Sequence, residues 1–384
     1  MSQAVDLEQE EMILDAVRDF LQTEVKPHVL KMEKEDIYPE EIVEQMKAMG
    51  LFGCIIDPKY GGLGLSTSTY AKIVSLITET WMSLSGIINS HLIMASAVQR
   101  HGTEEQKNYY LPKFATGELR GGVGLTEPDA GTDLQAIRTV AVREGDHYVV
   151  NGAKTWITNS MYGNTIALLV KTDPKAEPRH RGMSLLIAEK GPGFEVVRKL
   201  EKMGYRGIDT CELLFTDYKV PVDRLVGGVE GLGLKQVLSG LELGRINVAA
   251  RGLGIAQAAL TEAVNYSQVR KTFGKAICEH QAIQLMLGEM ATRVEASKLL
   301  VESAAKAFDE GRRCDMEAGM AKYFATEAGL SNATDCMRIH GGYGYSKEYP
   351  VERLYRDAPL LTIGEGTNEL QRIIIAKQLI ERSA

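Results

Sequence analysis

Glu365 stands between two glycines in the segment Gly364-Glu-Gly-Thr-Asn368. The glycines allow strained backbone angles and leave the glutamate side chain uncrowded. Thr367 or Asn368 can cap the helix that follows, with Gln371 three residues after Asn368. The carboxylate would then lie just before a helix N-terminus, where N–H donors and the dipole favour negative charge. An ionised carboxylate that an apolar ligand shields from water is the base that a carbon acid requires. A first-turn glutamate that only supports the cap is the alternative, and in isolation it is the commoner one.

A second group of polar residues lies in the middle of the chain and could hold a planar ligand. The segment 124–133, Gly-Leu-Thr-Glu-Pro-Asp-Ala-Gly-Thr-Asp, can direct backbone N–H groups at a ligand's polar edge, with Thr126 and Thr132 as further partners. Trp156, in Trp-Ile-Thr-Asn-Ser160, could stack beside a ring system. An ordinary surface turn and a tryptophan in the core of a sheet are the alternatives for these two motifs.

Two further motifs could bind phosphate or let a ligand approach the backbone. Arg270, in Arg-Lys-Thr-Phe-Gly274, can donate two hydrogen bonds to a pyrophosphate, although a cation at a helix C-terminus is also common. The glycines in His340-Gly-Gly-Tyr-Gly344 would allow a ligand to come close, unless they form only a turn between helices.

Several other kinds of chemistry have no matching motif. Gly231-Leu-Gly233 and Gly252-Leu-Gly254 do not complete the dinucleotide motif G-x-G-x-x-G, and the chain has neither the phosphate-binding loop nor the G-x-S-x-G nucleophile motif. The seven histidines form neither H-x-x-x-H nor H-E-x-x-H, and the five cysteines contain no C-x-x-C. We therefore expect no metal site and no disulfide framework, as in a reducing compartment.

Charge and composition narrow the partners and the compartment. The net charge is −7 and no basic block is present, so we expect neither a nucleic-acid partner nor binding to an anionic membrane surface. The first residues, Met-Ser-Gln-Ala-Val-Asp, resemble neither a signal peptide nor a transit peptide, and we expect a cytoplasmic protein. The uncharged stretch from Thr80 to Gln99 contains eight polar residues, which favours a buried helix over a membrane span.

The elements that must position these motifs change in type along the chain. The stretch from Leu7 to Val25 has apolar residues on one helical face, and Pro27 permits a break after it. Short apolar runs rich in β-branched and aromatic residues begin at residues 147, 156, 165, 183 and 211, separated by turn signals such as Asn151-Gly152, and predict strands. The apolar face of the first helix comprises Met12, Ile13, Val17, Phe20, Leu21 and Val25.

Helical spacing returns near residue 229. Eight residues at alternating steps of four and three form a seam about thirty residues long, and Gly311 follows it at a plausible position for ending a helix. Long helices with such seams favour a bundle and an oligomer. The seam comprises Ile283, Leu287, Met290, Val294, Ser297, Val301, Ala304 and Phe308.

We therefore predict an α+β multidomain fold in a chain of 384 residues. An N-terminal all-helical domain would span residues 1–119 and a middle β-barrel or β-sandwich domain residues 120–228. A C-terminal domain built around a four-helix bundle would span residues 229–384.

Taken in order, five motifs resemble those of the acyl-CoA dehydrogenase family of flavoproteins. They are GLTEPDAGTD, WITNS, RKTFGK with EHQAIQ, IHGGYGY with RLYRDA, and GEGTNELQR. The resemblance covers nearly the whole chain. It implies non-covalently bound FAD at a contact between subunits of a homotetramer, a dimer of dimers, and acyl-CoA as the substrate.

The resemblance also implies roles for individual residues. Glu365 matches the catalytic base of the family, and Gly244 stands where a subset of members carries the base instead. Thr132, Glu242 and Arg245 match positions at the pantetheine arm of CoA, and Gly366 is a further substrate-binding position. The positions that match flavin contacts are Val123, Leu125, Thr126, Gly131, Thr132, Trp156, Ile157, Thr158, Thr367 and Glu369. The positions that match the pyrophosphate and adenosine side, partly from a neighbouring subunit, are Arg270, Thr272, Phe273, His280, Gln281, Gly341, Gly342 and Gly344.

The implied reaction is removal of two hydrogens from an acyl-CoA thioester, giving a trans-2-enoyl-CoA. Glu365 takes the α-proton, the flavin takes the β-hydride, and the backbone N–H of the base and a flavin hydroxyl stabilise the enolate oxygen. Electrons would pass to electron-transferring flavoprotein, in the degradation of fatty acids or of branched or cyclic acids. An acyl-CoA oxidase or another specialised member would use the same residues. A silent CoA- or flavin-binding helical scaffold would have a substituted base.

Three positions bear on the substrate. Gly364 stands where several relatives carry a tyrosine, which favours a wider pocket and branched or cyclic acyl groups. Asp129 stands where glycine or asparagine is more usual, and we interpret it as a tolerated change in a turn. The stretch from Ile73 to Gln99 has no Lys or Arg, whereas glutaryl-type relatives carry an Arg there, so a dicarboxylyl substrate is disfavoured.

Overall fold

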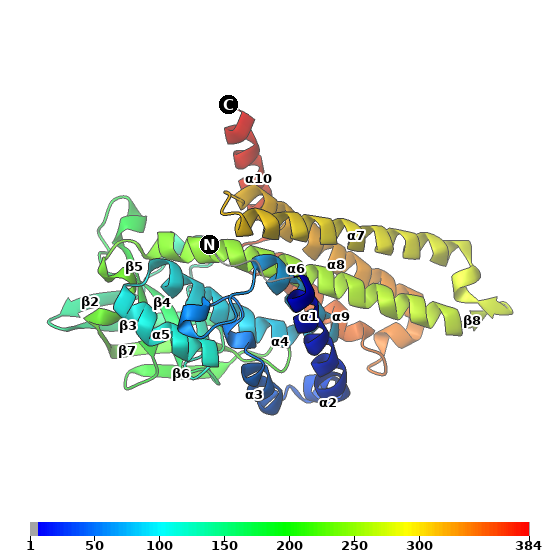
Figure 1. Ribbon diagram of the computed structural model, residues 1–384, viewed down its shortest axis with the longest axis horizontal. Helices are drawn as coiled ribbons and strands as arrows, with labels where there is room; N and C mark the ends of the chain where they lie inside the picture. Colours follow the sequence, from blue (N-terminus) through cyan, green and yellow to red (C-terminus); the bar gives the residue numbers. More distant parts are fainter. Residues whose placement is uncertain (1–6, 384) are drawn as a thin grey trace.

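The computed structural model describes residues 7–383. The elements follow the chain as helices, then strands, then helices (Figure 1). This order confirms the predicted α+β fold class. The first strand begins at Gly121 and the first long helix after the sheet begins at Gly233, so we keep 120–228 as the proposed limits of the middle domain.

The N-terminal part consists of helices that pack around one long, buried helix, α4. Most of the uncharged stretch from Thr80 to Gln99 is buried within α4, as predicted. Within residues 7–383 no helix is both long and apolar enough to cross a membrane. The helices are α1 (Leu7–Phe20), α2 (Lys26–Glu35), α3 (Glu40–Ala48), α4 (Thr67–His101) and α5 (Glu104–Thr116).

The predicted break at Pro27 is wrong. A π-helical turn, Leu21–Val25, connects α1 directly to α2, and Pro27 lies in the first turn of α2. A proline is tolerated there because the N–H that it lacks would have no partner within the helix. Met12 is also misplaced in the predicted apolar face, since it is 67% exposed while the neighbouring Leu14 is buried.

Seven strands form one sheet in the order β1-β4-β2-β3-β7-β6, with β5 paired to β4. The centres of β4 and β5, residues 166–170 and 185–188, are continuously apolar because alternate residues enter two different cores. Ala167 and Leu169 face α4 and α5, whereas Leu168 faces the opposite side. The strands are β1 (Gly121–Gly124), β2 (Val140–Glu144), β3 (His147–Thr158), β4 (Thr165–Lys171), β5 (Met183–Glu189), β6 (Phe194–Lys199) and β7 (Thr210–Pro221).

The structure corrects the predicted strands in one place. The runs that begin at residues 147 and 156 belong to a single strand, β3, and Asn151-Gly152 is not a turn. Gly152 instead lies against Thr139, where a Cβ atom would come within 2.5 Å of the threonine hydroxyl. The glycine therefore serves a close approach of two strands, next to an irregularity in the pairing of β3 with β7.

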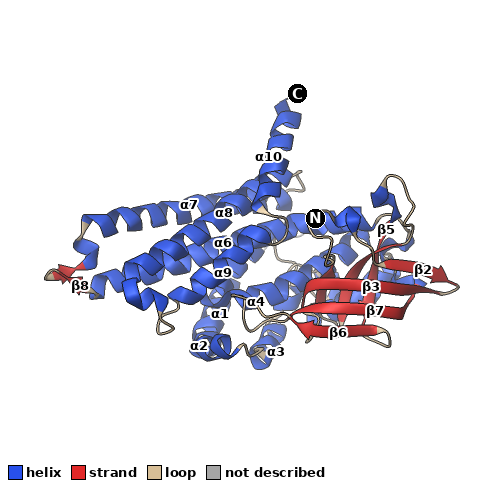
Figure 2. Cartoon of the chain, turned by 180° about the vertical axis from the view of Figure 1, so that it is seen from behind, coloured by secondary structure: helices blue, strands red, loops and turns tan. Residues whose placement is uncertain are grey.

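The C-terminal helices form the bundle, and the hairpin of β8 (Lys271–Thr272) and β9 (Lys275–Ala276) joins two of them. The seam on α7 is buried or packed against the core, and Gly311 follows the helix with φ 68°, as predicted. Helix α10 projects from the body of the molecule (Figures 1 and 2). The helices are α6 (Gly233–Val269), α7 (Gln281–Asp309), α8 (Asp315–His340), α9 (Val351–Ile363) and α10 (Asn368–Ser383).

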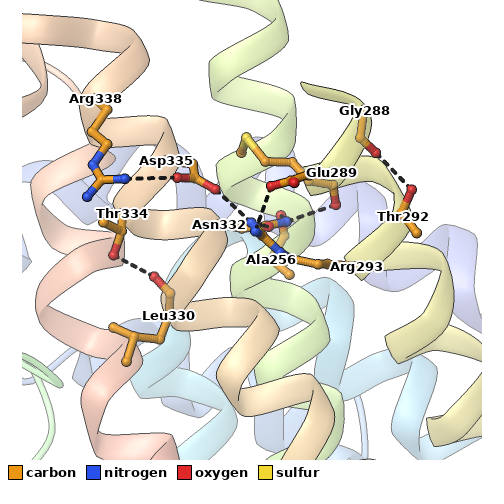
Figure 3. A network of polar contacts seen from close by, with 11 residues as sticks. Ala256, Gly288, Glu289, Thr292, Arg293, Leu330, Asn332, Thr334, Asp335 and Arg338 are labelled. Atoms are coloured by element: carbon orange, nitrogen blue, oxygen red, sulfur yellow. Dashed lines mark hydrogen bonds and ion pairs between the residues drawn. The ribbon is translucent and has the colours of Figure 1, made fainter. Parts of the chain in front are cut away.

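A polar network fixes three of these helices to one another (Figure 3). The buried Asn332 of α8 donates to the carbonyls of Ala256 on α6 (3.2 Å) and Met290 on α7 (3.1 Å). Arg293 of α7 donates to Asn332 (3.3 Å) and pairs with Asp335 of α8 (2.6 Å). Because Asn332 is buried and partnered, and Arg293 and Asp335 are partly buried and paired, the network defines one register between the helices.

The two residues of α1 give a test of which face is buried. We expect Leu14→Ala to lower the free energy of unfolding by about 2–5 kcal/mol, because it leaves a cavity in the core. Met12→Ala, the matched control, should change it by less than about 0.5 kcal/mol. Urea unfolding of the two variants measures both values, and equal losses would contradict this arrangement.

Candidate active site

Glu365 lies in a short loop between α9 and α10. Its φ is 53° and that of Gly366 is 86°, so both residues have left-handed backbone conformations. For a residue with a Cβ atom this conformation costs about 1–2 kcal/mol and persists only if the surroundings hold it. Thr367, rather than Asn368, caps α10, because its hydroxyl accepts a hydrogen bond from the Leu370 N–H (3.3 Å).

Lys322 of α8 holds this loop from beneath. It is completely buried and donates to the Gly366 carbonyl (2.9 Å) and to Asn368 Oδ1 (2.8 Å). A longer bond of 3.4 Å reaches the Thr362 carbonyl on the other side of Glu365. Burial lowers the pKa of Lys322 to about 8, and the negative charge of Glu365 partly offsets this effect. The lysine therefore fixes the backbone on both sides of Glu365.

The carboxylate of Glu365 is enclosed between α4 and α6. Asn89 of α4 donates to its Oε1 atom at 2.5 Å, whereas Oε2 is shielded from solvent and has no hydrogen-bond partner. Gly244 of α6 lies directly against Oε2, and a Cβ atom on Gly244 would overlap this oxygen. A glycine at position 244 is therefore required for the observed position of the carboxylate.

Burial raises the pKa of Glu365, and four groups oppose this effect. In order of size they are the charge of Arg251, the hydrogen bond from Asn89, and the charges of Lys322 and Arg245. A carboxylate in such surroundings binds a proton more strongly than an exposed glutamate does. With one oxygen held and the other free, it can act as a general base toward a proton presented at Oε2.

The polar segment 124–133 is fixed to the sheet by a buried ion pair. Lys154 of β3 pairs with Glu127 (2.9 Å) and also donates to the Leu125 carbonyl (3.0 Å). Glu127 in turn accepts hydrogen bonds from the backbone N–H groups of Arg138 and Thr139. The segment is therefore not an ordinary surface turn, because a buried ion pair and the hydrogen bonds to Glu127 fix its conformation.

Trp156 is presented outward and does not lie in the core. It has φ 61° at an irregular position of β3, and 58% of it is exposed. Thr126 lies next to this strand, since its carbonyl accepts a hydrogen bond from the Thr155 N–H (2.9 Å). Leu125 and Ile157 are buried, while Gly131 and Thr132 are exposed on the segment. The structure thus places Leu125 and Thr126 beside the part of β3 that presents the exposed indole ring, whereas Thr367 and Glu369 lie at the start of α10.

The second group of predicted flavin residues surrounds a separate groove of about 550 Å³. Arg270, Thr272, Gly341 and Gly342 line it. His280 is within hydrogen-bond distance of the Thr272 hydroxyl (3.0 Å), Phe273 is 96% exposed, and Gln281 begins α7. Gly344 differs from the other glycines, since it is buried where a Cβ atom would meet the Met337 carbonyl.

The two groups belong to different parts of the fold. The β8–β9 hairpin is at one end of the long helices, and the sheet is at the other end of the molecule (Figures 1 and 2). Two of the four predicted substrate residues, Glu242 and Arg245, lie on α6, where Arg245 is 3.7 Å from Asp315 and burial, together with Asp315, raises the pKa of Glu242. Thr132 lies on the exposed segment 124–133, and Gly366 lies beside Glu365.

Three family models cover most of this chain. The N-terminal, middle and C-terminal domains of acyl-CoA dehydrogenase match residues 7–118, 122–218 and 231–380. An acyl-CoA dehydrogenase of Bacillus subtilis is 41% identical over 371 residues, covering 96% of this chain and 97% of the relative.

The chain belongs to the acyl-CoA dehydrogenase family. The solved structure of butyryl-CoA dehydrogenase from Megasphaera elsdenii is similar to it with a TM-score of 0.94 and 35% identity, over 98% of this chain and 99% of that one. A chain from a structure named for the electron-transferring flavoprotein of Acidaminococcus fermentans is similar with a TM-score of 0.94 and 38% identity, over 99% and 100% of the two chains.

This acyl-CoA dehydrogenase is an oxidoreductase of acyl-CoA, and FAD is its cofactor, as in the family. The residues present fit the cofactor. The exposed Trp156 offers a face for a ring system, and the groove beside Arg270 offers a cation and an open glycine turn for phosphates. No Cβ atom at Gly341 or Gly342 would meet another atom within 4 Å, so the backbone is open there.

Several residues of the dehydrogenase's site were missed from the sequence. Asn89 was counted only among the polar residues of the uncharged stretch, and Lys322 and Arg251 were not singled out. Lys322 and Arg251 are each the one charged residue of an otherwise uncharged helical stretch, and this pattern is the signal that could have identified them. Lys154 gave a similar signal within β3. Asn89 gave no such signal, because Ser90 and His91 follow it.

The contact between Gly244 and Glu365 gives a direct test. We expect Gly244→Ala to lower kcat by about 10²-fold or more, because the added methyl displaces the carboxylate. Gly240→Ala, one turn earlier on α6, is the matched control, because its Cβ atom would meet Ile93 at an ordinary 3.4 Å. Steady-state dye reduction by the two flavin-loaded variants measures the difference, and equal activities would contradict the observed position of the carboxylate.

Proposed function

We propose that this dehydrogenase converts a short, medium-length or branched acyl-CoA thioester into the trans-2-enoyl-CoA, with Glu365 as the catalytic base. One observation carries the proposal. The Glu365 carboxylate is enclosed, held through Oε1 and free at Oε2. A general base needs this combination of fixed position and an unoccupied oxygen.

The chain supplies two groups to the reacting carbons. Glu365 removes the α-proton at Oε2. Its backbone N–H has no hydrogen-bond acceptor among residues 7–383, so it can donate to the thioester oxygen as negative charge develops there. Bound FAD supplies the acceptor for the β-hydride. The thioester thus loses one proton to the glutamate and one hydride to the cofactor, and a C=C bond forms.

We further propose that a second subunit completes the cofactor site. The exposed Trp156 is carried by the sheet and the groove beside Arg270 lies at the β8–β9 end of the bundle, which supports a groove that serves the flavin of a neighbouring subunit. A homotetramer built as a dimer of dimers accommodates this pairing. Thr132, Glu242 and Arg245 are the proposed contacts with the pantetheine arm.

Electron-transferring flavoprotein is the proposed electron acceptor. The structural likeness to the chain from the Acidaminococcus fermentans structure supports this partner. Consumption of oxygen with formation of peroxide during turnover would instead indicate an oxidase.

The assignment of the base is tested by Glu365→Gln. The variant should bind FAD and keep its yellow colour, but acyl-CoA-dependent dye reduction should fall by about 10²–10⁴-fold or more, because the amide cannot accept the proton. Glu295→Gln, an exposed glutamate of α7, is the control and should be unchanged. Activity near that of the wild type in Glu365→Gln would overturn the assignment.

The pH dependence of flavin reduction follows from the raised pKa of Glu365. The base must be ionised, so the rate should fall as the pH drops through this pKa, at a higher pH than for an ordinary glutamate. Asn89→Ala removes a hydrogen bond that lowers the pKa, and should therefore move the acid limb to still higher pH. Stopped-flow measurement of flavin reduction across the pH range gives the acid limb of the wild type and of Asn89→Ala. The same acid limb in both proteins would contradict the role of this hydrogen bond.

A further inference from the structure

Arg251 of α6 is a buried cation without a counter-ion. Only 4% of it is exposed, and its Nε atom has no hydrogen-bond partner. Within residues 7–383 it forms no salt bridge, and its guanidinium lies 5.1 Å from the centre of the Tyr205 ring. An arginine remains charged when buried, so it cannot avoid the cost of leaving water by losing a proton.

The other buried cations of this chain show how unusual this is. Lys154 pairs with Glu127 at 2.9 Å and Arg120 with Glu40 at 3.4 Å. Arg245, whose Nε atom also lacks a hydrogen-bond partner, lies 3.7 Å from Asp315. Lys322 has no carboxylate but donates to two carbonyls and to Asn368. Since a buried charge is retained when a partner compensates it, Arg251 points to an anion that is not part of this chain.

Arg251 lies about two helical turns from the point where α6 contacts Glu365. Gly244 and Arg251 are seven residues apart on α6, which places them on the same face and about 10 Å apart along the axis. Gly244 contacts the Glu365 carboxylate, and the charge of Arg251 acts on that carboxylate without pairing with it. The Tyr205 ring beneath the guanidinium is pressed against Gly86 of α4, where a Cβ atom would overlap its hydroxyl. The guanidinium therefore lies deep between α4 and α6.

Other polar atoms near Glu365 also lack partners. Asn247 donates to the Tyr70 hydroxyl (2.7 Å), but its Oδ1 atom is buried and unpaired, as is Oδ1 of Asn89. A purely hydrocarbon acyl chain would leave all of these atoms unsatisfied. An acyl chain that ends in an anion would pair with Arg251 and bring water or its own polar atoms to the two amides.

We propose that Arg251 binds a carboxylate at the far end of the acyl group, so that the preferred substrates are CoA monothioesters of short dicarboxylic acids. The proposal rests on the function proposed above and specifies its substrate class. The sequence-based argument against such substrates considered only the stretch from Ile73 to Gln99. In the structure the cation is Arg251, which comes from α6.

Two five-carbon thioesters provide a matched test, because valeryl-CoA and glutaryl-CoA differ only in a terminal methyl or carboxylate. The FAD-loaded wild type should have a higher kcat/KM for glutaryl-CoA than for valeryl-CoA by about 10-fold or more. Arg251→Gln removes a charge that acts on Glu365 and should slow both substrates, but above the acid limb of each protein it should lower kcat/KM for glutaryl-CoA by about 10-fold or more relative to valeryl-CoA, so that the preference is lost. Arg251→Lys should retain part of the preference, and the exposed Arg338→Gln should change neither substrate.

The outcomes separate this proposal from the proposed function. If the wild type oxidises valeryl-CoA at least as well as glutaryl-CoA, Arg251 does not select a carboxylate and the proposal is overturned, even if no variant folds. Equal losses on both thioesters in Arg251→Gln, with a moved acid limb, would show that Arg251 acts only as a countercharge for Glu365. Both of these results leave the proposed function intact. Oxidation of no acyl-CoA thioester at all would overturn both.

Discussion

Keeping one carboxylate out of water without neutralising it is the constraint on which the site of this dehydrogenase depends. An enclosed carboxylate is costly unless surrounding groups compensate its charge. Here Asn89 holds one oxygen, and more distant cations act on the charge without forming an ion pair with it. The second oxygen remains free only because position 244 carries no side chain. A direct salt bridge would have stabilised the fold more simply, but it would have occupied the oxygen that a base must keep available.

The helical bundle supplies the rigidity that this arrangement needs. Glu365 has a left-handed backbone conformation, which is strained for a residue with a side chain. Lys322 binds carbonyls on both sides of it, and Asn332 fixes α8, which carries Lys322, to α6 and α7. The strain in one loop is therefore held by interactions within three long helices. Helix α6 links the two sides of the site, since it carries Gly244 beside the carboxylate and Arg251 farther along the same face.

The sheet also uses a buried interaction to fix a polar segment. The buried ion pair of Lys154 and Glu127 holds the segment 124–133 in one conformation at the surface. The irregular position in β3 then turns Trp156 outward, where a flat ring can reach it. The groove beside Arg270 lies at the β8–β9 end of the bundle, away from the sheet (Figures 1 and 2). The fold thus separates two halves of a cofactor site, which is the physical basis for proposing a neighbouring subunit.

The sequence alone determined the order of helices, strands and helices, because periodicity and turn residues are local properties. It also predicted Glu365 and the flavin motifs, through the resemblance of short motifs that are each contiguous along the chain. It failed where the outcome depended on neighbours distant in sequence. Pro27 was tolerated because a π-helical turn precedes it, and Gly152 continued a strand because Thr139 packs against it. Asn89, Lys322 and Arg251 come from three helices, and they meet around Glu365 only when α4, α6 and α8 pack together. The packing of the helices decides whether a polar side chain has a partner. Only the tertiary structure could therefore show which polar residues belong to the site.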